Sequence, residues 1–122
     1  MGTRSGIIAK IGNSYQGIYC HWDGYPEGVG KTLKEHYTDP AKIAALIALG
    51  DISSLGERVA PKEGEAHSFA SPGNGVTNSY RRDRGESGCE PRTGTLTKIK
   101  QDLVRYNAEY LYIWDGKKWK TY

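Results

Sequence analysis

The chain has 122 residues, the length of one domain, and its 17 basic and 14 acidic residues leave a net charge of +3. So small an excess argues against a dedicated duplex-binding protein. No apolar run approaches the roughly 18 residues of a transmembrane helix, and the N-terminus lacks the apolar stretch of a secretory signal, so we expect no membrane anchor and no export. Two cysteines, Cys20 and Cys89, are too few for a disulfide framework, and we expect both to be reduced.

The first elements are predicted to be a hairpin and a loop. Residues 7–11 and 15–20 are β-prone runs on either side of a Gly-Asn-Ser turn, which predicts two antiparallel strands. Residues 21–30 contain three glycines, a proline and two aromatic residues, which favours an irregular loop. A short helix is expected next, over residues 31–37.

A second helix follows directly. Asp39 as N-cap and Pro40 in the first helical position predict its start, and Gly50 predicts its end. Its apolar face consists of Ile43, Leu46, Ile47 and Leu49. Residues 51–56 are expected to form a turn or a short helical piece.

The second half of the chain is richer in loops. Glycine and proline punctuate residues 60–75, which predicts a mobile loop around a short extended piece at 67–69. Residues 76–80 predict a third strand, residues 87–95 a second mobile loop, and residues 96–106 a short helix.

A closing hairpin is predicted at 109–114 and 119–122, because Asp115-Gly116 is a strong turn signal between two aromatic runs. The summed elements predict a single α+β domain over residues 1–122. We expect a small antiparallel sheet of four to six strands with two consecutive helices packed on one face.

Aromatic side chains in the glycine-rich loops are candidates for stacking on a base. The chain has nine Tyr, three Trp, one Phe and 16 Gly, which suits a recognition surface, but a tyrosine-rich core would give the same counts. Trp22 and Tyr25 follow the hairpin, and Phe69 lies in the central loop. The alternative is that these rings fill the core or an interface.

The run Arg81-Arg82-Asp83-Arg84-Gly85-Glu86 carries three guanidinium groups that suit bidentate contact with phosphate. If the preceding strand continues, alternation sends Arg82 and Arg84 to one face. A solvated charge cluster, or a set of salt bridges in a dimer, explains the run equally well.

Enzymatic signatures are weak. Gly30-Lys31-Thr32 resembles the end of a phosphate-binding loop, but Tyr25 stands where that motif needs glycine. The three scattered histidines have no zinc-site spacing, and we expect no metal or cofactor. A metal-dependent hydrolase or nuclease using Asp83 and Glu86 is one alternative, and inhibition of a host protein is another.

Several segments carry a resemblance: Thr3-Arg4-Ser5, Gly17-Ile18-Tyr19-Cys20-His21-Trp22-Asp23-Gly24-Tyr25, Gly50-Asp51-Ile52-Ser53-Ser54-Leu55-Gly56 and Arg82-Asp83-Arg84-Gly85-Glu86. In these the chain is similar to small proteins encoded by bacteriophages and prophages. Within that class it most resembles the Thoeris anti-defence sponges. That family sequesters cyclic ADP-ribose-type signals made by TIR-domain enzymes, and some members also bind cyclic oligonucleotides.

The resemblance implies an α+β fold, a homo-oligomer, no catalysis and a place in the cytoplasm of the infected bacterial host. A cyclic ADP-ribose isomer needs an aromatic platform, cationic groups for its diphosphate and polar groups for its riboses. A chain this short encloses such a ligand poorly, so a pocket between protomers is expected. The candidate ligand-binding residues are Trp22, Tyr25, Phe69, Arg4, Arg82, Arg84, Asp23, Asn78 and Glu86.

Overall fold

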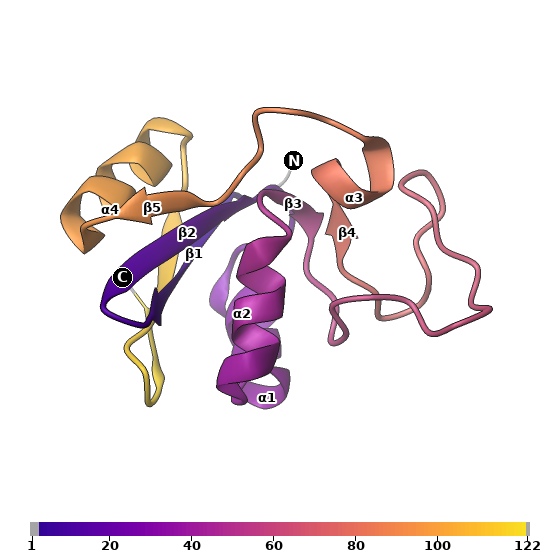
Figure 1. The fold of residues 1–122 in the computed structure, drawn as a ribbon, viewed down its shortest axis with the longest axis horizontal. Helices are drawn as coiled ribbons and strands as arrows, with labels where there is room; N and C mark the ends of the chain where they lie inside the picture. The colour runs from indigo at the N-terminus through magenta and orange to yellow at the C-terminus, as the bar shows by residue number, and fades with distance from the viewer. Residues whose placement is uncertain (1–2, 122) are drawn as a thin grey trace.

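The computed structural model describes residues 3–121, which form an α+β fold (Figure 1). This confirms the predicted class. The strands are β1 (Ser5–Ile11), β2 (Ser14–Cys20), β3 (Ile52–Ser54), β4 (Asn78–Ser79), β5 (Arg92–Gly94), β6 (Tyr110–Trp114) and β7 (Trp119–Thr121). The helices are the π-helix η1 (Pro26–Gly30) and the α-helices α1 (Lys31–His36), α2 (Pro40–Ala48), α3 (Tyr80–Arg84) and α4 (Leu96–Arg105).

The sheet is mixed. Within residues 3–121 its strand order is β4-β3-β2-β1-β6-β7, and β5 pairs with the start of β2. The predicted hairpins β1–β2 and β6–β7 are antiparallel, but β1 pairs in parallel with β6, and β2 with β3. The sheet therefore differs from a wholly antiparallel one, because crossover connections join parallel neighbours. The connection from β2 to β3 runs through α1 and α2.

One face of the sheet is covered by α1 and α2, as expected (Figure 1). The Asp39 carboxylate accepts a hydrogen bond from the Ala41 N–H at 3.0 Å, which confirms the predicted N-cap of α2. Gly50 has a φ of 78°, the left-handed conformation that commonly follows a helix. The core on this face includes Ile7, Ala9, Ile18, Cys20, Leu33, Tyr37, Ile43, Leu46, Ile47, Tyr112 and Trp114.

The opposite face is covered by α4, which packs on β1, β2 and β6. Alternation along β1 sends Ile8 to this face and its neighbours to the other. A close approach of helix and sheet requires Gly17, since a Cβ there would lie 2.5 Å from Ile99 Cγ2. The core on this face consists of Ile8, Tyr19, Ile99, Leu103, Leu111 and Ile113.

Four predicted segments differ from the structure. The irregular loop predicted at 21–30 ends in the π-helix η1. The turn predicted at 51–56 contains the strand β3, which is held by long-range pairing with β2 and β4. The strand predicted at 76–80 is limited to β4, because Ser79 caps the helix α3 that begins at Tyr80. The loop predicted at 87–95 contains β5, which is paired with β2. No helix within residues 3–121 is long and apolar enough to cross a membrane.

Candidate functional site

The loop after β2 presents two exposed aromatic side chains. Trp22 is 43% exposed and Tyr25 is 39% exposed, so neither ring fills the core. The backbone that carries them is fixed: the Trp22 N–H donates to the Ser53 carbonyl at 2.9 Å, and the Tyr112 hydroxyl donates to the Gly24 carbonyl at 2.6 Å. Exposed rings on a rigid backbone lose little conformational entropy when they stack on a ligand.

Asp23 stabilises the same loop. Its φ of 56° is a left-handed conformation that aspartate tolerates better than most residues. Its carbonyl accepts from the Val29 N–H at 2.8 Å, and its carboxylate accepts from the Tyr25 hydroxyl at 3.2 Å. The nearby carboxylate raises the pKa of Tyr25. Asp23 therefore positions Tyr25, and it keeps an exposed carboxylate beside Trp22.

Four rings form a row along the end of β2, which we call the aromatic row: Tyr106, Tyr19, His21 and Trp22. The ring centroids of Tyr106 and Tyr19 are 5.7 Å apart, and His21 meets Trp22 edge-on at 4.8 Å. The Tyr19 hydroxyl and His21 Nδ1 are hydrogen-bonded at 2.8 Å. Tyr106, Tyr19 and His21 were not among the predicted site residues, although strand alternation places Tyr19 and His21 on one face.

Cys20 faces the other side of the sheet, among the residues that pack under α2. Burial raises the pKa of its thiol to about 12, so it stays protonated at neutral pH. Its neighbour His21 lies against Tyr19 on the opposite face, so the two side chains do not form a nucleophile–base pair.

A second group, which we call the Arg84 shelf, consists of Phe69, Tyr80, Arg84 and Glu86. The Arg84 guanidinium lies 4.6 Å from the Phe69 ring centroid and 5.2 Å from that of Tyr80. Its Nη2 donates to Glu86 Oε1 at 2.6 Å. Phe69 is therefore covered on one side by Arg84, whose half-exposed guanidinium forms the outer surface of the shelf.

Ser53 connects the shelf to the aromatic row. Its carbonyl accepts from the Trp22 N–H, and its strand β3 pairs with β4, which leads directly into Tyr80. Burial raises the pKa of Tyr80, and the Ser53 side chain opposes that rise. Burial also raises the pKa of Tyr19, with Arg4 opposing the rise and Tyr80 adding to it. The predicted residues Trp22, Phe69, Arg84, Glu86 and Arg4 therefore lie at one end of the sheet.

Arg82 is not available as a phosphate ligand, contrary to the expectation. Its Nε donates to Asp83 Oδ1 at 2.9 Å, Nη1 donates to the Val59 carbonyl and Nη2 to the Thr77 carbonyl, both at 2.5 Å. These bonds tie α3 to the chain before and after the central loop. The alternation argument fails because residues 80–84 are helical, so Arg82 and Arg84 point to different surroundings.

Asp83 is equally occupied. Its side chain is 6% exposed, and Oδ2 lies 3.0 Å from His67 Nε2 and accepts from the Ser79 N–H at 2.8 Å. Burial alone would raise the pKa of Asp83, but the hydrogen bonds from Arg82 and the Ser79 N–H, with the His67 ring 3.0 Å away, outweigh it and hold the pKa at about 2. His67 Nδ1 accepts from the Gly73 N–H at 2.9 Å, so a neutral ring carries its proton on the Nε2 that faces Asp83.

The pair Asp83 and Glu86, considered for a metal-dependent hydrolase, does not converge. The oxygens of Asp83 bind Arg82, His67 and a backbone amide, while Glu86 binds Arg84. Within residues 3–121 no group of three His, Cys, Asp or Glu side chains is placed to hold a metal ion.

Asn78 also differs from the expectation that it binds ribose. It is 5% exposed, and its amide nitrogen donates to the Phe69 carbonyl at 3.1 Å. Asn78 therefore holds the backbone of Phe69 in the Arg84 shelf and is almost fully shielded from solvent. Asn78 Oδ1 is buried and has no hydrogen-bond partner among the described residues.

Asp51 organises the site from within and is not apparent from the sequence. Its Oδ1 accepts from the Tyr19 N–H at 2.9 Å and from Arg92 Nη1 at 2.7 Å. The Arg92 guanidinium also lies 4.7 Å from the Tyr106 ring centroid. The Asp51 N–H donates to the Cys89 carbonyl at 2.8 Å, which fixes the segment that connects α3 to β5 (Figure 1).

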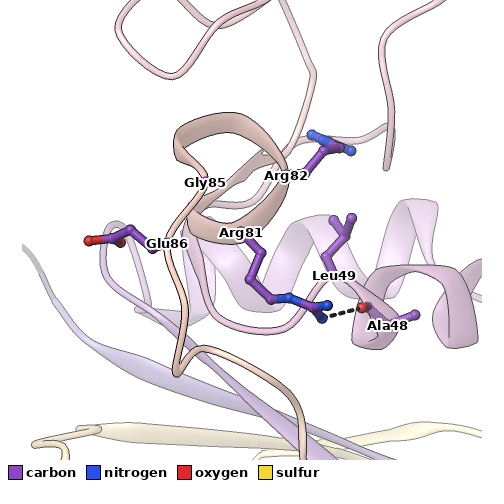
Figure 2. A pocket seen from close by; sticks show the side chains of 6 residues that line it. All are labelled: Ala48, Leu49, Arg81, Arg82, Gly85 and Glu86. Atoms are coloured by element: carbon purple, nitrogen blue, oxygen red, sulfur yellow. Dashed lines mark hydrogen bonds between the residues drawn. The ribbon is translucent and has the colours of Figure 1, made fainter.

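A pocket of about 320 Å³ lies between the end of α2 and α3 (Figure 2). It is lined by Ala48, Leu49, Arg81, Arg82, Gly85 and Glu86. Arg81 extends across it toward Ala48, whereas the side chains of Arg82 and Glu86 point away from that guanidinium (Figure 2).

No protein-family model, curated protein or solved structure matches this chain, so its function has to be inferred from the site itself.

Proposed function

We propose that this protein binds a small cyclic nucleotide signal, of the cyclic ADP-ribose type or a cyclic oligonucleotide, and sequesters it without converting it. The resemblance to phage anti-defence sponges motivates the proposal. The observation that carries it is the Arg84 guanidinium, held over the rings of Phe69 and Tyr80 on the helix that follows β4, while the neighbouring strand β3 holds the exposed Trp22 through the Ser53 carbonyl.

Arg84 supplies the cationic group that a diphosphate needs. One face of its guanidinium is packed on the two rings and one nitrogen is bound to Glu86, while Nε and Nη1 donate to no residue within 3–121. The rings orient the group before a ligand arrives, which lowers the entropy cost of binding. Guanidinium N–H groups match the geometry of phosphate oxygens.

Trp22 supplies the platform for a base. Its ring is 43% exposed, its backbone is bound to Ser53, and His21 supports it edge-on. Stacking of a base on such a ring contributes about 1–3 kcal/mol. The Asp23 carboxylate beside it and Glu86 on the shelf are acceptors for ribose hydroxyls or an adenine amino group.

A homo-oligomer completes the site in this proposal. A single chain leaves Trp22 and Tyr25 open to solvent, so a ligand stacked there is covered on one side only. A second protomer placed over these rings would enclose the ligand. Sequestration also needs no activated nucleophile, which is compatible with the protonated Cys20 and the fully occupied Asp83.

The test is titration calorimetry and native mass spectrometry of the purified protein with a cyclic ADP-ribose isomer. We expect a ligand mass on an oligomer, intact ligand after denaturation, and at least tenfold weaker binding for Trp22→Ala and Arg84→Gln. The matched controls Val104→Ala and Arg105→Gln change an exposed apolar and an exposed cationic residue of α4, and should bind as the parent does.

Recovery of a cleaved ligand would refute sequestration in favour of an enzyme. Absence of binding, together with one stoichiometric host protein in a pull-down, would favour inhibition of that protein. If the site variants and the α4 controls lose the same amount of ligand affinity, Trp22 and Arg84 do not form the binding site.

A further inference from the structure

We propose that the pocket between α2 and α3 is an oxyanion site centred on Arg81, which binds a phosphate group of a small ligand. The pocket has a volume of about 320 Å³, at the lower end of the range of roughly 300–1,000 Å³ for small-molecule sites. It lies on a different side of α3 from the Arg84 shelf: Arg81 lies against Gly50 and Ala48, whereas Arg84 lies against Phe69 and Tyr80. The inference does not depend on the proposed nucleotide function.

Arg81 is held in place by its stem. The stem packs closely against Gly50, where an added Cβ would lie 3.1 Å from Arg81 Cδ. The guanidinium then reaches the end of α2, where Nη1 donates to the Ala48 carbonyl at 3.4 Å (Figure 2). This contact uses one edge of the group and fixes its orientation.

The opposite edge is open. Nε and Nη2 of Arg81 donate to no residue within 3–121, and these two nitrogens form the side-on fork that binds two oxygens of one phosphate. In Arg82, by contrast, all three nitrogens donate to protein groups. Of the two arginines that line this pocket, Arg81 is therefore the one whose fork can receive a phosphate.

The charge balance of the pocket points the same way. Arg82 is paired with Asp83, and Glu86 is paired with Arg84. Arg81 makes no ion pair with any residue that the structure describes, so its charge is the uncompensated one among the lining residues. Ala48 and Leu49 add an apolar wall, which suits a phosphate carried on a small organic group.

The experiment uses inorganic pyrophosphate as the probe and follows backbone amide shifts of the full chain by NMR at low salt. We expect the largest shifts at Ala48, Leu49 and Gly85, which line the pocket and do not belong to the shelf, and we expect these shifts to saturate as pyrophosphate is added. Arg81→Gln should weaken binding at least tenfold, and Arg81→Lys should lose a smaller part because it keeps the charge without the fork. The control Arg105→Gln, which removes one exposed positive charge from α4, should change binding less than twofold.

Equal weakening by Arg81→Gln and Arg105→Gln would overturn the proposal, because it would show non-specific attraction. Shifts confined to Trp22, Phe69 and Arg84 would overturn it as well, because they would place the anion on the shelf. The amide spectrum of each variant without probe shows whether the fold is kept, and Arg81→Lys preserves the test if Arg81→Gln unfolds. If the parent protein does not bind cyclic ADP-ribose but still shows the pyrophosphate shifts, the proposed function is refuted and the Arg81 site stands.

Discussion

Replacing Asp83 with Asn tests whether the contacts of this α3 carboxylate with Arg82 and His67 hold the central loop, residues 60–75, against α3. Asp83 joins Arg82, the His67 ring and the Ser79 amide. Asparagine has nearly the same shape, but it carries no charge and its amide nitrogen cannot accept a hydrogen bond, so the variant removes the charge and one of the two acceptor oxygens. We expect a folded protein with lower stability at neutral pH.

The magnitude follows from the pKa. The ordinary value of 3.8 falls to about 2 in the folded protein, and this difference corresponds to about 2 kcal/mol of stability. Because the folded protein has the lower pKa, the unfolded chain takes up the proton first. The contribution is therefore complete above about pH 4 and is lost as the pH falls toward 2.

The assay is urea unfolding followed by tryptophan fluorescence at pH 7 and at several values down to pH 2. Asp83→Asn should be about 2 kcal/mol less stable than the parent at pH 7, and the two should converge at pH 2. Glu65, whose pKa the Arg58 guanidinium lowers to about 2, titrates in the same range but is present in both proteins, so it cancels from their difference. A gap that stays constant from pH 7 to pH 2 would refute the reasoning.

Four further variants or reagents test other parts of the structure. Gly50→Ala should cost about 2 kcal/mol or more, because its φ is 78° and a Cβ would lie 2.1 Å from the Cys89 carbonyl oxygen; an unchanged melting temperature would contradict this. Leu103→Ala, on the buried face of α4, should cost about 2–5 kcal/mol in urea unfolding, and a loss under 1 kcal/mol would count against tight packing there. Asp51→Asn should lower the free energy of unfolding by about 1.5–3 kcal/mol and speed hydrogen exchange at the Tyr19 amide. Unchanged exchange would show that the Asp51 carboxylate does not protect that amide. A thiol reagent should label Cys89 in the native protein and Cys20 only on unfolding; rapid labelling of both would disprove the burial of Cys20.

Local signals predicted the parts of the fold that local chemistry determines. The helix α2 begins after Asp39 and at Pro40 and ends before Gly50, as these residues predict. The Asp115-Gly116 turn joins β6 to β7, also as predicted. The strand β3 escaped prediction because its three residues are held by partners far along the chain. The start of α3 did leave a signal: Ser79 Oγ accepts from the Arg82 N–H while Asp83 binds back to the Ser79 N–H.

For the site, the sequence indicated residue types better than residue roles. Trp22 is exposed in a glycine-rich loop as expected, and Arg84 meets an aromatic ring. The sequence pattern does not distinguish the role of Arg82 from that of Arg81, because their contacts come from distant parts of the chain. Arg82 donates to the Val59 and Thr77 carbonyls, whereas Arg81 lies in an open pocket. The fixed backbone under Trp22 likewise depends on Tyr112, 88 residues away from the Gly24 that it holds.

The parallel pairing of β1 with β6 makes the order of chain synthesis matter. Ser5 to Ala9 of β1 lie beside Tyr110 to Trp114, so the second edge of the first strand has no partner until the last hairpin has been made. A nascent chain that ends before residue 110 exposes an edge whose residues, Ile7 and Ile8 among them, are buried on both faces of the finished sheet. Such an edge recruits other strands. The closing aromatic hairpin therefore protects the chain from self-association during folding, and truncated products should aggregate even though they contain every residue of the Arg84 shelf.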